Sequence, residues 1–193
     1  MPTIYMIRHG EAAAGWDADM DPGLSEKGRA QSEAVAREIE ARVGRKLPIL
    51  TSPLRRCRET SEPLATLWGR VPYIEPRVAE VPSAVEDLAA RGAWLRRLMA
   101  GTWAEANLPE NNGNGALDLI AWRDAVGEAL TELTEDTVIF SHFIAINVAA
   151  GLATGDDRLV CFRPDNCSVT VLETSGKRIR LVEQGREADT KVN

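Results

Sequence analysis

Short apolar segments alternate with longer helical segments along most of this chain, and this alternation constrains its fold more than any other feature. The apolar segments have the length and composition of buried strands. They are residues 3–7, 48–52, 71–74, 137–140, 158–162, 168–173 and 179–183. Strands separated by helices pair mainly in parallel, whereas the last two segments, joined by a turn at 174–177, predict an antiparallel hairpin. We therefore expect an α/β fold with three layers, in which helices flank a mainly parallel sheet with an antiparallel edge.

Helix signals fill the intervals between the predicted strands. Ser25 is a typical N-cap for the Ala-, Glu- and Arg-rich segment 26–43, and Gly44 ends that segment. Pro53 suits the first turn of a second helix. Pro63 should kink or end this helix, because proline removes a backbone donor and crowds the preceding turn. Two further helices are expected at residues 116–133 and 144–153.

The length of 193 residues fits one domain with a single core. Ser83 and Glu86 form a capping box, which predicts a helix from there to about Met99. A loop rich in Asn, Gly and Pro follows, and we interpret residues of about 81–117 as a helical lid insertion. The tail, residues 186–193, should be flexible, because chain ends are often poorly ordered. We expect residues 1–193 to form one domain that includes both segments.

Composition argues against several classes of function. The chain has 23 Lys and Arg against 29 Asp and Glu, and its net charge of −6 gives no general reason to bind nucleic acid or an anionic membrane. No apolar run is long enough to span a bilayer, and the first strand begins too close to Met1 to leave room for a signal peptide. Cys57, Cys161 and Cys167 lack the spacing of a zinc site or a redox pair. We expect reduced thiols in a soluble, cytoplasmic protein.

Charged and nucleophilic side chains follow three of the predicted strands at the point where each strand ends. These stretches are Arg8-His9-Gly10, Ser52-Pro53-Leu54-Arg55-Arg56 and Ser141-His142. In open α/β sheets, ligands bind at the carboxyl ends of the strands. The chain has only two histidines, His9 and His142, and both stand at such places. A lone histidine there is more often structural than catalytic, but two of them, with arginines at matching strand ends, indicate a shared site.

These residue types can perform a limited range of chemistry. Arginine presents a fixed fork of donors that suits phosphate oxygens, and a neutral imidazole nitrogen can attack phosphorus. Gly10 lets the backbone pass close to a ligand, so we count it among the substrate-binding residues. No cluster resembles a metal site, and no Gly-rich nucleotide-binding loop precedes a helix. The residues predict phosphoryl transfer through a histidine, with neither a metal nor another cofactor.

At these positions the sequence resembles the histidine phosphatase superfamily, also called phosphoglycerate mutase-like. Arg8-His9-Gly10-Glu11 is similar to the Arg-His-Gly that ends the family's first strand. The stretch 52–56 with Thr60 matches the second family element, and His142 matches the late histidine. The segment Leu24–Gln31 is also similar, so the resemblance covers most of the chain. It implies a phosphoglycerate mutase-like fold.

The resemblance also implies a role for each of five side chains. His9 would be the nucleophile that becomes phosphohistidine. Arg8, Arg56 and His142 would hold the phosphoryl oxygens and balance the charge of the transition state. Glu80 is the best match for the carboxylate that gives a proton to the leaving oxygen. The structural alternative is that Glu80 is only a solvated loop carboxylate.

Three positions depart from the family pattern. Thr and Asn are common in the family where this chain has Ala12 and Gly15, which would remove one phosphate contact. Glycine usually follows the late histidine, whereas Phe143 stands there in this chain and could narrow the site or move His142. The sequence does not decide what these changes do to the chemistry.

The function that we expect is metal-independent hydrolysis of a phosphomonoester, carried by a small metabolite or a phosphoprotein. A phosphoglycerate-type mutase is the alternative among enzymes. The dedicated mutases of the family resemble longer chains, in which an insertion supplies extra substrate contacts, and we find no counterpart of those contacts in this sequence. A non-catalytic phosphate-binding module is the alternative outside enzymes. Substrate contacts should come from about 81–117, where no motif identifies the substrate. The oligomeric state is equally open.

Overall fold

The computed structural model describes residues 1–15, 18–83 and 85–188. Within this part of the chain, six strands form one sheet in the order β3-β2-β4-β1-β5-β6. The strands are β1 (Thr3–Arg8), β2 (Ile49–Thr51), β3 (Tyr73–Ile74), β4 (Thr137–Ser141), β5 (Val169–Ser175) and β6 (Arg178–Glu183). The first four strands are parallel, and β5 pairs antiparallel with both β1 and β6. The predicted α/β fold, a mainly parallel sheet with an antiparallel edge, is confirmed.

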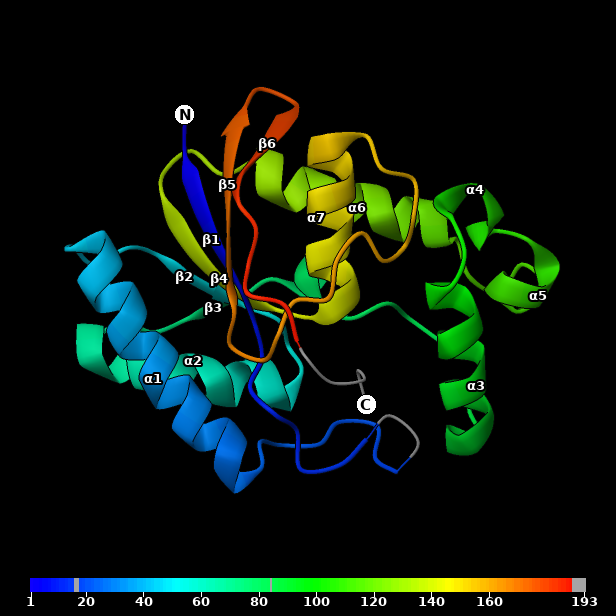
Figure 1. Ribbon diagram of the computed structural model, residues 1–193, viewed down its shortest axis with the longest axis horizontal. Coiled ribbons are helices and arrows are strands. Elements are labelled where there is room, and N and C mark those ends of the chain that lie inside the picture. Colours follow the sequence, from blue (N-terminus) through cyan, green and yellow to red (C-terminus); the bar gives the residue numbers. More distant parts are fainter. Residues whose placement is uncertain (16–17, 84, 189–193) are drawn as a thin grey trace.

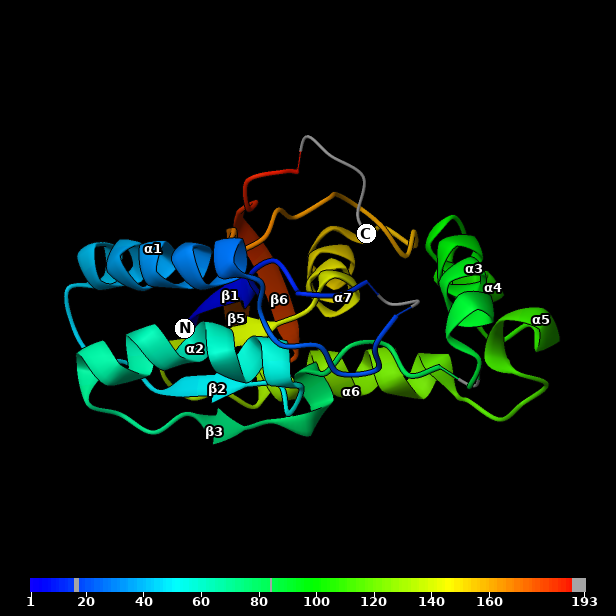
Figure 2. The same ribbon diagram turned by 90° about the horizontal axis from the view of Figure 1, so that it is seen from below.

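Helices cover both faces of this sheet. They are α1 (Glu26–Val43), α2 (Arg55–Trp68), α3 (Leu88–Met99), α4 (Trp103–Ala106), α5 (Pro109–Asn112), α6 (Leu119–Thr131) and α7 (Phe143–Thr154), with a 3₁₀ turn η1 (Pro76–Val78). Helices α1 and α2 lie on one side, and α6 and α7 lie on the other (Figures 1 and 2). Helices α3 to α5 lie beyond α7, at the end of the molecule far from α1 (Figure 1).

Successive side chains along each strand point to opposite faces of the sheet, so apolar residues are buried on both faces. Met6 and Ile139 are buried on the face that α6 and α7 cover. Ile7 and Phe140, the next residues along the same strands, are buried on the face that α1 and α2 cover. A strand buried on both faces reads as a continuous apolar run, which explains why β1 and β4 lack a polar alternation.

Helix α1 has the predicted bounds, whereas α2 does not end at Pro63, which was one of the two predicted effects of this proline. Ser25 caps α1 by accepting a hydrogen bond from the Gly28 N–H at 3.0 Å, and Gly44 ends the helix at a φ of 65°. Helix α2 continues through Pro63 to Trp68. The turn after the proline buries Trp68, which is 1% exposed, and this packing outweighs the lost backbone hydrogen bond.

The predicted start of the helix that ends at Met99 was also wrong. Ser83 does not form a capping box with Glu86, because its hydroxyl accepts from the backbone N–H of Val85 at 3.1 Å in a local turn. Helix α3 begins later, where the Asp87 side chain accepts from the Ala90 N–H at 2.8 Å. Asp and Ser are both good N-caps, and the sequence does not show which of them the chain uses.

Residues 158–162, which we expected to be a strand, form a loop. The side chain of Asn147 in α7 accepts hydrogen bonds from the backbone N–H groups of Cys161 and Phe162, at 2.7 and 3.1 Å. Leu159 donates its N–H to the carbonyl of Gly101 at 3.1 Å. These partners replace a neighbouring strand, so an apolar segment is buried here without joining the sheet.

Two predicted segments remain, the insertion at about 81–117 and the tail at 186–193. The predicted insertion contains α3 to α5, and its Trp94 and Trp103 pack into the core beside α6 and α7. Its role as a lid stays a prediction.

At the tail, the N–H of Ala188 donates to the carbonyl of Arg163 at 2.9 Å, so residues 186–188 are held against a loop. Residues 189–193 lie outside the described residues. Among the residues described, the helices are too short or too polar to cross a bilayer.

Candidate active site

The carboxyl ends of β1, β4 and β2 lie side by side at one end of the sheet. Arg8, the last residue of β1, is opposite Ser141, the last residue of β4. The N–H of His9 donates to the carbonyl of Ser141 at 3.0 Å, which continues this pairing by one residue. Strand β2 also pairs with β4 and ends at Thr51, and the N–H of the next residue, Ser52, donates to the carbonyl of Phe140 in β4 at 3.0 Å. His9, His142 and Ser52 therefore emerge together, as the sequence predicted for the strand ends.

His9 is held in one tautomer, which frees its other ring nitrogen. Nδ1 lies 2.7 Å from the carbonyl oxygen of Gly10, so we assign the ring proton to Nδ1, which donates it there. Nε2 lies 3.1 Å from Nε of Arg56 and accepts a hydrogen bond from the guanidinium. The side-chain amide of Asn166 donates to the His9 carbonyl at 2.9 Å. A lone pair on Nε2 is what a histidine nucleophile requires.

His142 is anchored on one side and faces the site on the other. Its Nδ1 lies 3.1 Å from Nη2 of Arg56, which can only donate. The ring proton therefore sits on Nε2, which lies 2.7 Å from Oγ of Ser52 and 3.2 Å from Sγ of Cys57. The rings of His9 and His142 meet edge to face, with centroids 5.3 Å apart. The two histidines thus belong to one site.

Arg56 joins the two histidines through its guanidinium, and its backbone supports the loop after β1. It stands in the first turn of α2 and is 2% exposed. Its backbone carbonyl accepts from the hydroxyl of Thr60 at 2.6 Å, and that hydroxyl accepts from the Gly10 N–H at 3.0 Å. The family element that contains Arg56 and Thr60 therefore ties α2 to the residue after His9.

Arg8 reaches this site from the end of β1. Its Nη1 donates to the carbonyl of Pro164 at 2.9 Å, and its Nε is buried with no partner among the described residues. The guanidinium carbon lies 5.2 Å from the centroid of the Phe143 ring. Phe143 is fully buried, so the residue that replaces the family's glycine packs against Arg8 and makes a cation–π contact.

Glu80 is buried, so the alternative of a solvated loop carboxylate was wrong. It is 7% exposed, and its Oε1 accepts from the backbone N–H groups of Val81 at 3.0 Å and Ile144 at 3.3 Å. Oε2 is buried without a partner in the described part of the chain. Burial raises the pKa of Glu80, although the Val81 N–H and the charges of Arg56 and Arg8 oppose the shift. Because Oε1 is already an acceptor, a protonated Glu80 would carry its proton on Oε2.

Both histidines are neutral near pH 7. Burial lowers the pKa of His9 well below its ordinary value, and the charges of Arg56 and Arg8 lower it further. Burial likewise lowers the pKa of His142, with smaller contributions from Arg56, His9 and Arg8 in the same direction. The site therefore combines neutral imidazoles with two fixed positive charges, which suits an anionic ligand and a nitrogen nucleophile.

The space beside Gly10 is filled by another part of the chain. A Cβ on Gly10 would lie 2.6 Å from the carbonyl oxygen of Gly28, and a Cβ on Gly28 would lie 2.1 Å from that of Glu11. The first turn of α1 thus presses against the loop that follows β1, which only glycine permits. This contact explains Gly10 without a ligand, and its role in substrate binding stays a prediction.

The sequence did not reveal three supports of the site. Ser52 lies in the predicted motif but was given no role, although its hydroxyl holds His142. Cys57, for which we expected only a reduced thiol, is fully buried and contacts the same imidazole, and burial raises the pKa of its thiol. Asn166 supports the His9 backbone from a loop distant in sequence, and no local pattern indicates this contact.

Comparison with known proteins agrees with this geometry. The sequence pattern of the histidine phosphatase superfamily (branch 1) matches residues 4–186. The chain belongs to this superfamily. A relative of this chain in Erwinia tasmaniensis, named "Probable phosphoglycerate mutase GpmB", is 28% identical over 190 residues, which cover 88% of this chain and 84% of the relative.

Solved structures confirm the fold of this chain. A phosphoserine phosphatase from Entamoeba histolytica, solved in complex with 3-phosphoglyceric acid, has a TM-score of 0.74 at 17% identity, and the match covers 98% of each chain. A mycobacterial glucosyl-3-phosphoglycerate phosphatase, solved with VO3, has a TM-score of 0.62 at 24% identity, covering 94% of this chain and 97% of the other. The phosphoglycerate mutase-like fold predicted from the sequence is therefore confirmed.

Replacing Ser52 with alanine should weaken the site by releasing His142. The variant leaves the Nε2 proton of His142 with only the Cys57 thiol as acceptor, so we expect kcat/KM for a phosphomonoester to fall about tenfold. Ser61→Ala is the matched control, because Ser61 is also buried in this region but bonds to the Arg58 carbonyl of its own helix. Steady-state kinetics with thermal melts checks this, and equal losses in both variants would contradict it.

The two histidines should make the folded protein less stable in acid. Their pKa values are about 6.5 when unfolded and lower when folded, so unfolding takes up protons below this pH. The stability that they confer is present above about pH 6.5 and is lost as pH falls, by at most about 1.4 kcal/mol per pH unit for each histidine. Glu80, with its raised pKa, acts in the opposite direction. Urea unfolding between pH 5 and pH 7 should show a smaller slope for His142→Gln than for the wild type, and equal slopes would refute the assignment.

Proposed function

We propose that this chain is a metal-independent phosphatase that hydrolyses a phosphomonoester through a phosphohistidine on His9. The observation that carries the proposal is the fixed tautomer of His9, whose Nδ1 is bonded to the Gly10 carbonyl while Nε2 lies 3.1 Å from Nε of Arg56. A guanidinium at that distance binds an oxygen of the phosphoryl group whose phosphorus the nitrogen attacks. Arg8 and His142 would bind the remaining oxygens.

The first half of the proposed reaction transfers the phosphoryl group to the enzyme. Nε2 of His9 forms a bond to phosphorus while the bond from phosphorus to the ester oxygen breaks. Glu80 donates the proton on its Oε2 to that departing oxygen, and the raised pKa of Glu80 keeps the proton available. Arg8 and Arg56 offset the negative charge of the transition state from fixed positions.

The second half returns the enzyme to its starting state. Glu80, now a carboxylate, takes a proton from a water molecule, and the oxygen of this water attacks phosphorus. The bond between phosphorus and Nε2 breaks, which releases inorganic phosphate and the neutral imidazole of His9. The Gly10 carbonyl holds the Nδ1 proton throughout, so the nucleophile returns in the same tautomer.

A phosphoglycerate-type mutase is the second candidate, because a relative that spans most of this chain carries that name. In a mutase the phosphohistidine returns its phosphoryl group to another oxygen of the bound product instead of to water. The compounds in the names of the three proteins described above are small phosphate esters, which supports a small metabolite as the substrate, whereas a solved structure from Agrobacterium tumefaciens with the same fold is named a "putative phosphohistidine phosphatase", which keeps a phosphoprotein as the alternative. A non-catalytic module is the least supported alternative, since nucleophile, guanidinium groups and buried carboxyl lie together.

The test is turnover of p-nitrophenyl phosphate and of 3-phosphoglycerate by the purified protein. We expect release of inorganic phosphate from both, unchanged by a chelator. Conversion of 3-phosphoglycerate to its isomer with little phosphate released would favour the mutase. Loss of activity in the chelator, restored by a divalent metal ion, would overturn the metal-independent mechanism, and inactivity over a broad panel of phosphate esters would favour the module.

A further inference from the structure

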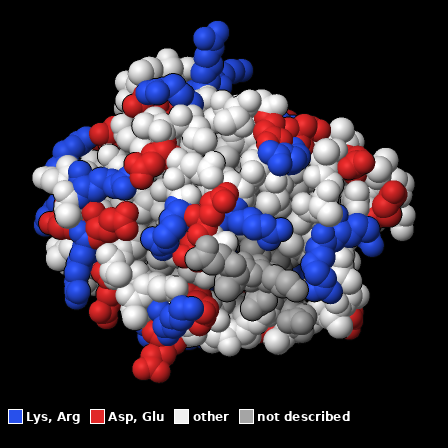
Figure 3. Space-filling model, in the orientation of Figure 1, with Lys and Arg blue, Asp and Glu red and all other residues white. Residues whose placement is uncertain are grey.

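The segment Leu24–Gln31 has no role in the proposed reaction, although it packs against the loop that carries His9 out of the sheet. Ser25, the N-cap of α1, donates its backbone N–H to the carbonyl of Glu11 at 2.9 Å. On the outer surface, Lys27 pairs with the carboxylate of Glu11 at 3.2 Å, and Figure 3 shows acidic and basic side chains next to one another over the start of α1. An exposed ion pair contributes little to the position of a loop, so other contacts must hold the backbone here.

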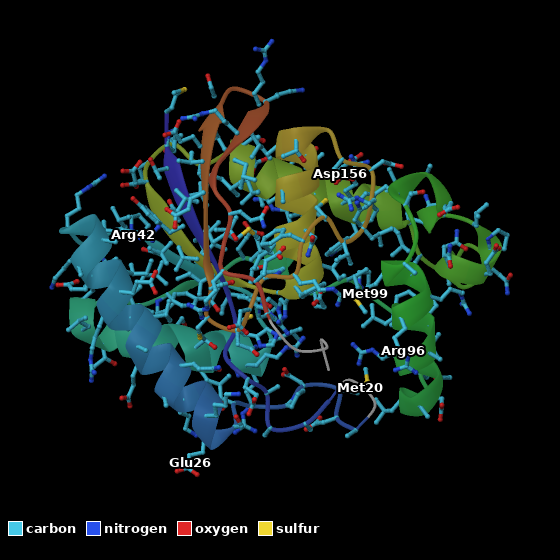
Figure 4. All side chains as sticks on the ribbon, viewed as in Figure 1. Met20, Glu26, Arg42, Arg96, Met99 and Asp156 are labelled. Carbon is cyan, nitrogen blue, oxygen red and sulfur yellow. The ribbon has the colours of Figure 1, made fainter. Side chains whose placement is uncertain are left out.

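Gln31, in the second turn of α1, reaches the backbone beside the proposed nucleophile. Its side-chain oxygen Oε1 accepts a hydrogen bond from the backbone N–H of Glu11 at 2.8 Å. That N–H belongs to the peptide group between Gly10 and Glu11, and the carbonyl oxygen of this group accepts from Nδ1 of His9 at 2.7 Å. Figure 4 shows the start of α1, marked by Glu26, next to the loop that follows β1. One peptide group therefore connects Gln31 to the ring of His9.

The preceding peptide group, between His9 and Gly10, is held by two other elements. Its carbonyl accepts from the side-chain amide of Asn166 at 2.9 Å, and its N–H donates to the hydroxyl of Thr60 at 3.0 Å. Both of its polar atoms thus have fixed partners. Glycine leaves the next peptide group free to turn unless a partner holds that group as well. Gln31 is this partner.

The two hydrogen bonds of the Gly10–Glu11 peptide group form a series from Gln31 to His9. They measure 2.8 and 2.7 Å, and the second of them is buried. Hydrogen bonds in series polarise one another, so the bond from Gln31 makes the Gly10 carbonyl a stronger acceptor. The hydrogen bond at one imidazole nitrogen decides which nitrogen carries the proton. A stronger acceptor at Nδ1 therefore keeps the proton there and the lone pair on Nε2.

We propose that Gln31 is a positioning residue that keeps His9 in its nucleophilic tautomer, acting through the peptide group between Gly10 and Glu11. This inference rests on the proposed function, because it concerns the nucleophile of that reaction. A residue that only stabilised α1 would change the free energy of unfolding and leave the tautomer as it is. The tautomer of His9 is thus the quantity that separates the two roles.

Nitrogen-15 NMR of the imidazole rings measures this tautomer directly, because protonated and unprotonated ring nitrogens resonate far apart. The chain has only two histidines, so the untagged protein gives two rings, and His142→Gln assigns them. The wild type should carry the His9 proton on Nδ1. Gln31→Met keeps the length of the side chain without its oxygen, and it should move part of this proton to Nε2. Gln31→Glu should keep the wild-type tautomer, since a carboxylate also accepts from an N–H.

Turnover should follow the tautomer. For p-nitrophenyl phosphate, Gln31→Met should lower kcat/KM about tenfold and Gln31→Glu less than about threefold. Ser32→Ala is the matched control, because Ser32 is the next residue of α1, is buried, and bonds through its hydroxyl to the Arg29 carbonyl of the same helix. Whatever this control does to the melting temperature, it should change neither the His9 tautomer nor kcat/KM.

A Gln31→Met protein with the wild-type tautomer or the wild-type kcat/KM would overturn the proposal. The same change of tautomer in Gln31→Glu or in Ser32→Ala would also overturn it. The NMR measurement needs no turnover, so the two hypotheses fail separately. If the wild type turns over p-nitrophenyl phosphate and its tautomer does not depend on Gln31, only the role of Gln31 fails. If the wild type turns over no phosphate ester, the proposed function fails, whatever the NMR spectrum shows.

Discussion

Replacing His9 with alanine should abolish phosphatase activity, with a loss in kcat of at least about 10³-fold on every phosphomonoester. The variant removes the Nε2 lone pair of His9, which lies beside Arg56 in a ring whose tautomer is fixed by the bond from Nδ1 to the Gly10 carbonyl. Arg56 and His142 would remain to bind phosphate, so affinity for inorganic phosphate should fall much less than turnover. Steady-state kinetics together with phosphate titration measures both.

A neighbouring residue provides the control for this experiment. Arg55 precedes Arg56 on α2, but its side chain is exposed and pairs with Glu59 at 2.7 Å on the surface. Arg55→Gln should therefore keep activity close to that of the wild type. A His9→Ala protein that folds normally and still turns over p-nitrophenyl phosphate would refute the nucleophile assignment.

Replacing Glu80 with glutamine should lower kcat/KM, which reports phosphoryl transfer to His9, about 10²- to 10³-fold for alkyl phosphates and only about threefold or less for p-nitrophenyl phosphate. An alkoxide leaves only with a proton, whereas nitrophenolate leaves without one. The pH dependence of turnover by the wild type should also report the ionisation of Glu80. Because burial raises the pKa of Glu80, turnover of alkyl phosphates should persist above the range of an ordinary carboxyl and then fall as Glu80 loses its proton.

Glu86→Gln is the matched control for Glu80, since it removes a carboxyl from an exposed position of the same segment. It should alter neither substrate's turnover. Equal losses of kcat/KM for both substrate types in Glu80→Gln would show that Glu80 supports the structure of the site and does not donate a proton to the leaving oxygen. An unchanged rate with alkyl phosphates would remove Glu80 from the mechanism.

The strand and helix pattern was readable from the sequence because most of it is local. Ser25 and Gly44 bound α1 through contacts within a few residues, and both were predicted. Errors arose where distant partners decide. Pro63 is tolerated because the following turn packs into the core, and residues 158–162 leave the sheet because Asn147 supplies their hydrogen bonds. Neither cause can be seen in a short window of sequence.

The candidate site, too, was only partly predictable from the sequence. His9 and His142 were predicted to meet because parallel neighbouring strands deliver their carboxyl ends to one place, and the structure brings both to Arg56. The burial of Glu80 was not readable, because it depends on N–H groups of Val81 and of α7, which is distant in sequence.

The most direct test of the central claim is to trap the enzyme during turnover and locate the phosphoryl group. The protein is mixed rapidly with p-nitrophenyl phosphate, quenched in alkali, in which phosphohistidine is stable, and digested for mass spectrometry. Our account predicts an acid-labile phosphoryl group on the peptide that contains His9, formed within one turnover and absent from His9→Ala. Turnover without any phosphorylated peptide, or with the phosphoryl group on His142, would contradict it.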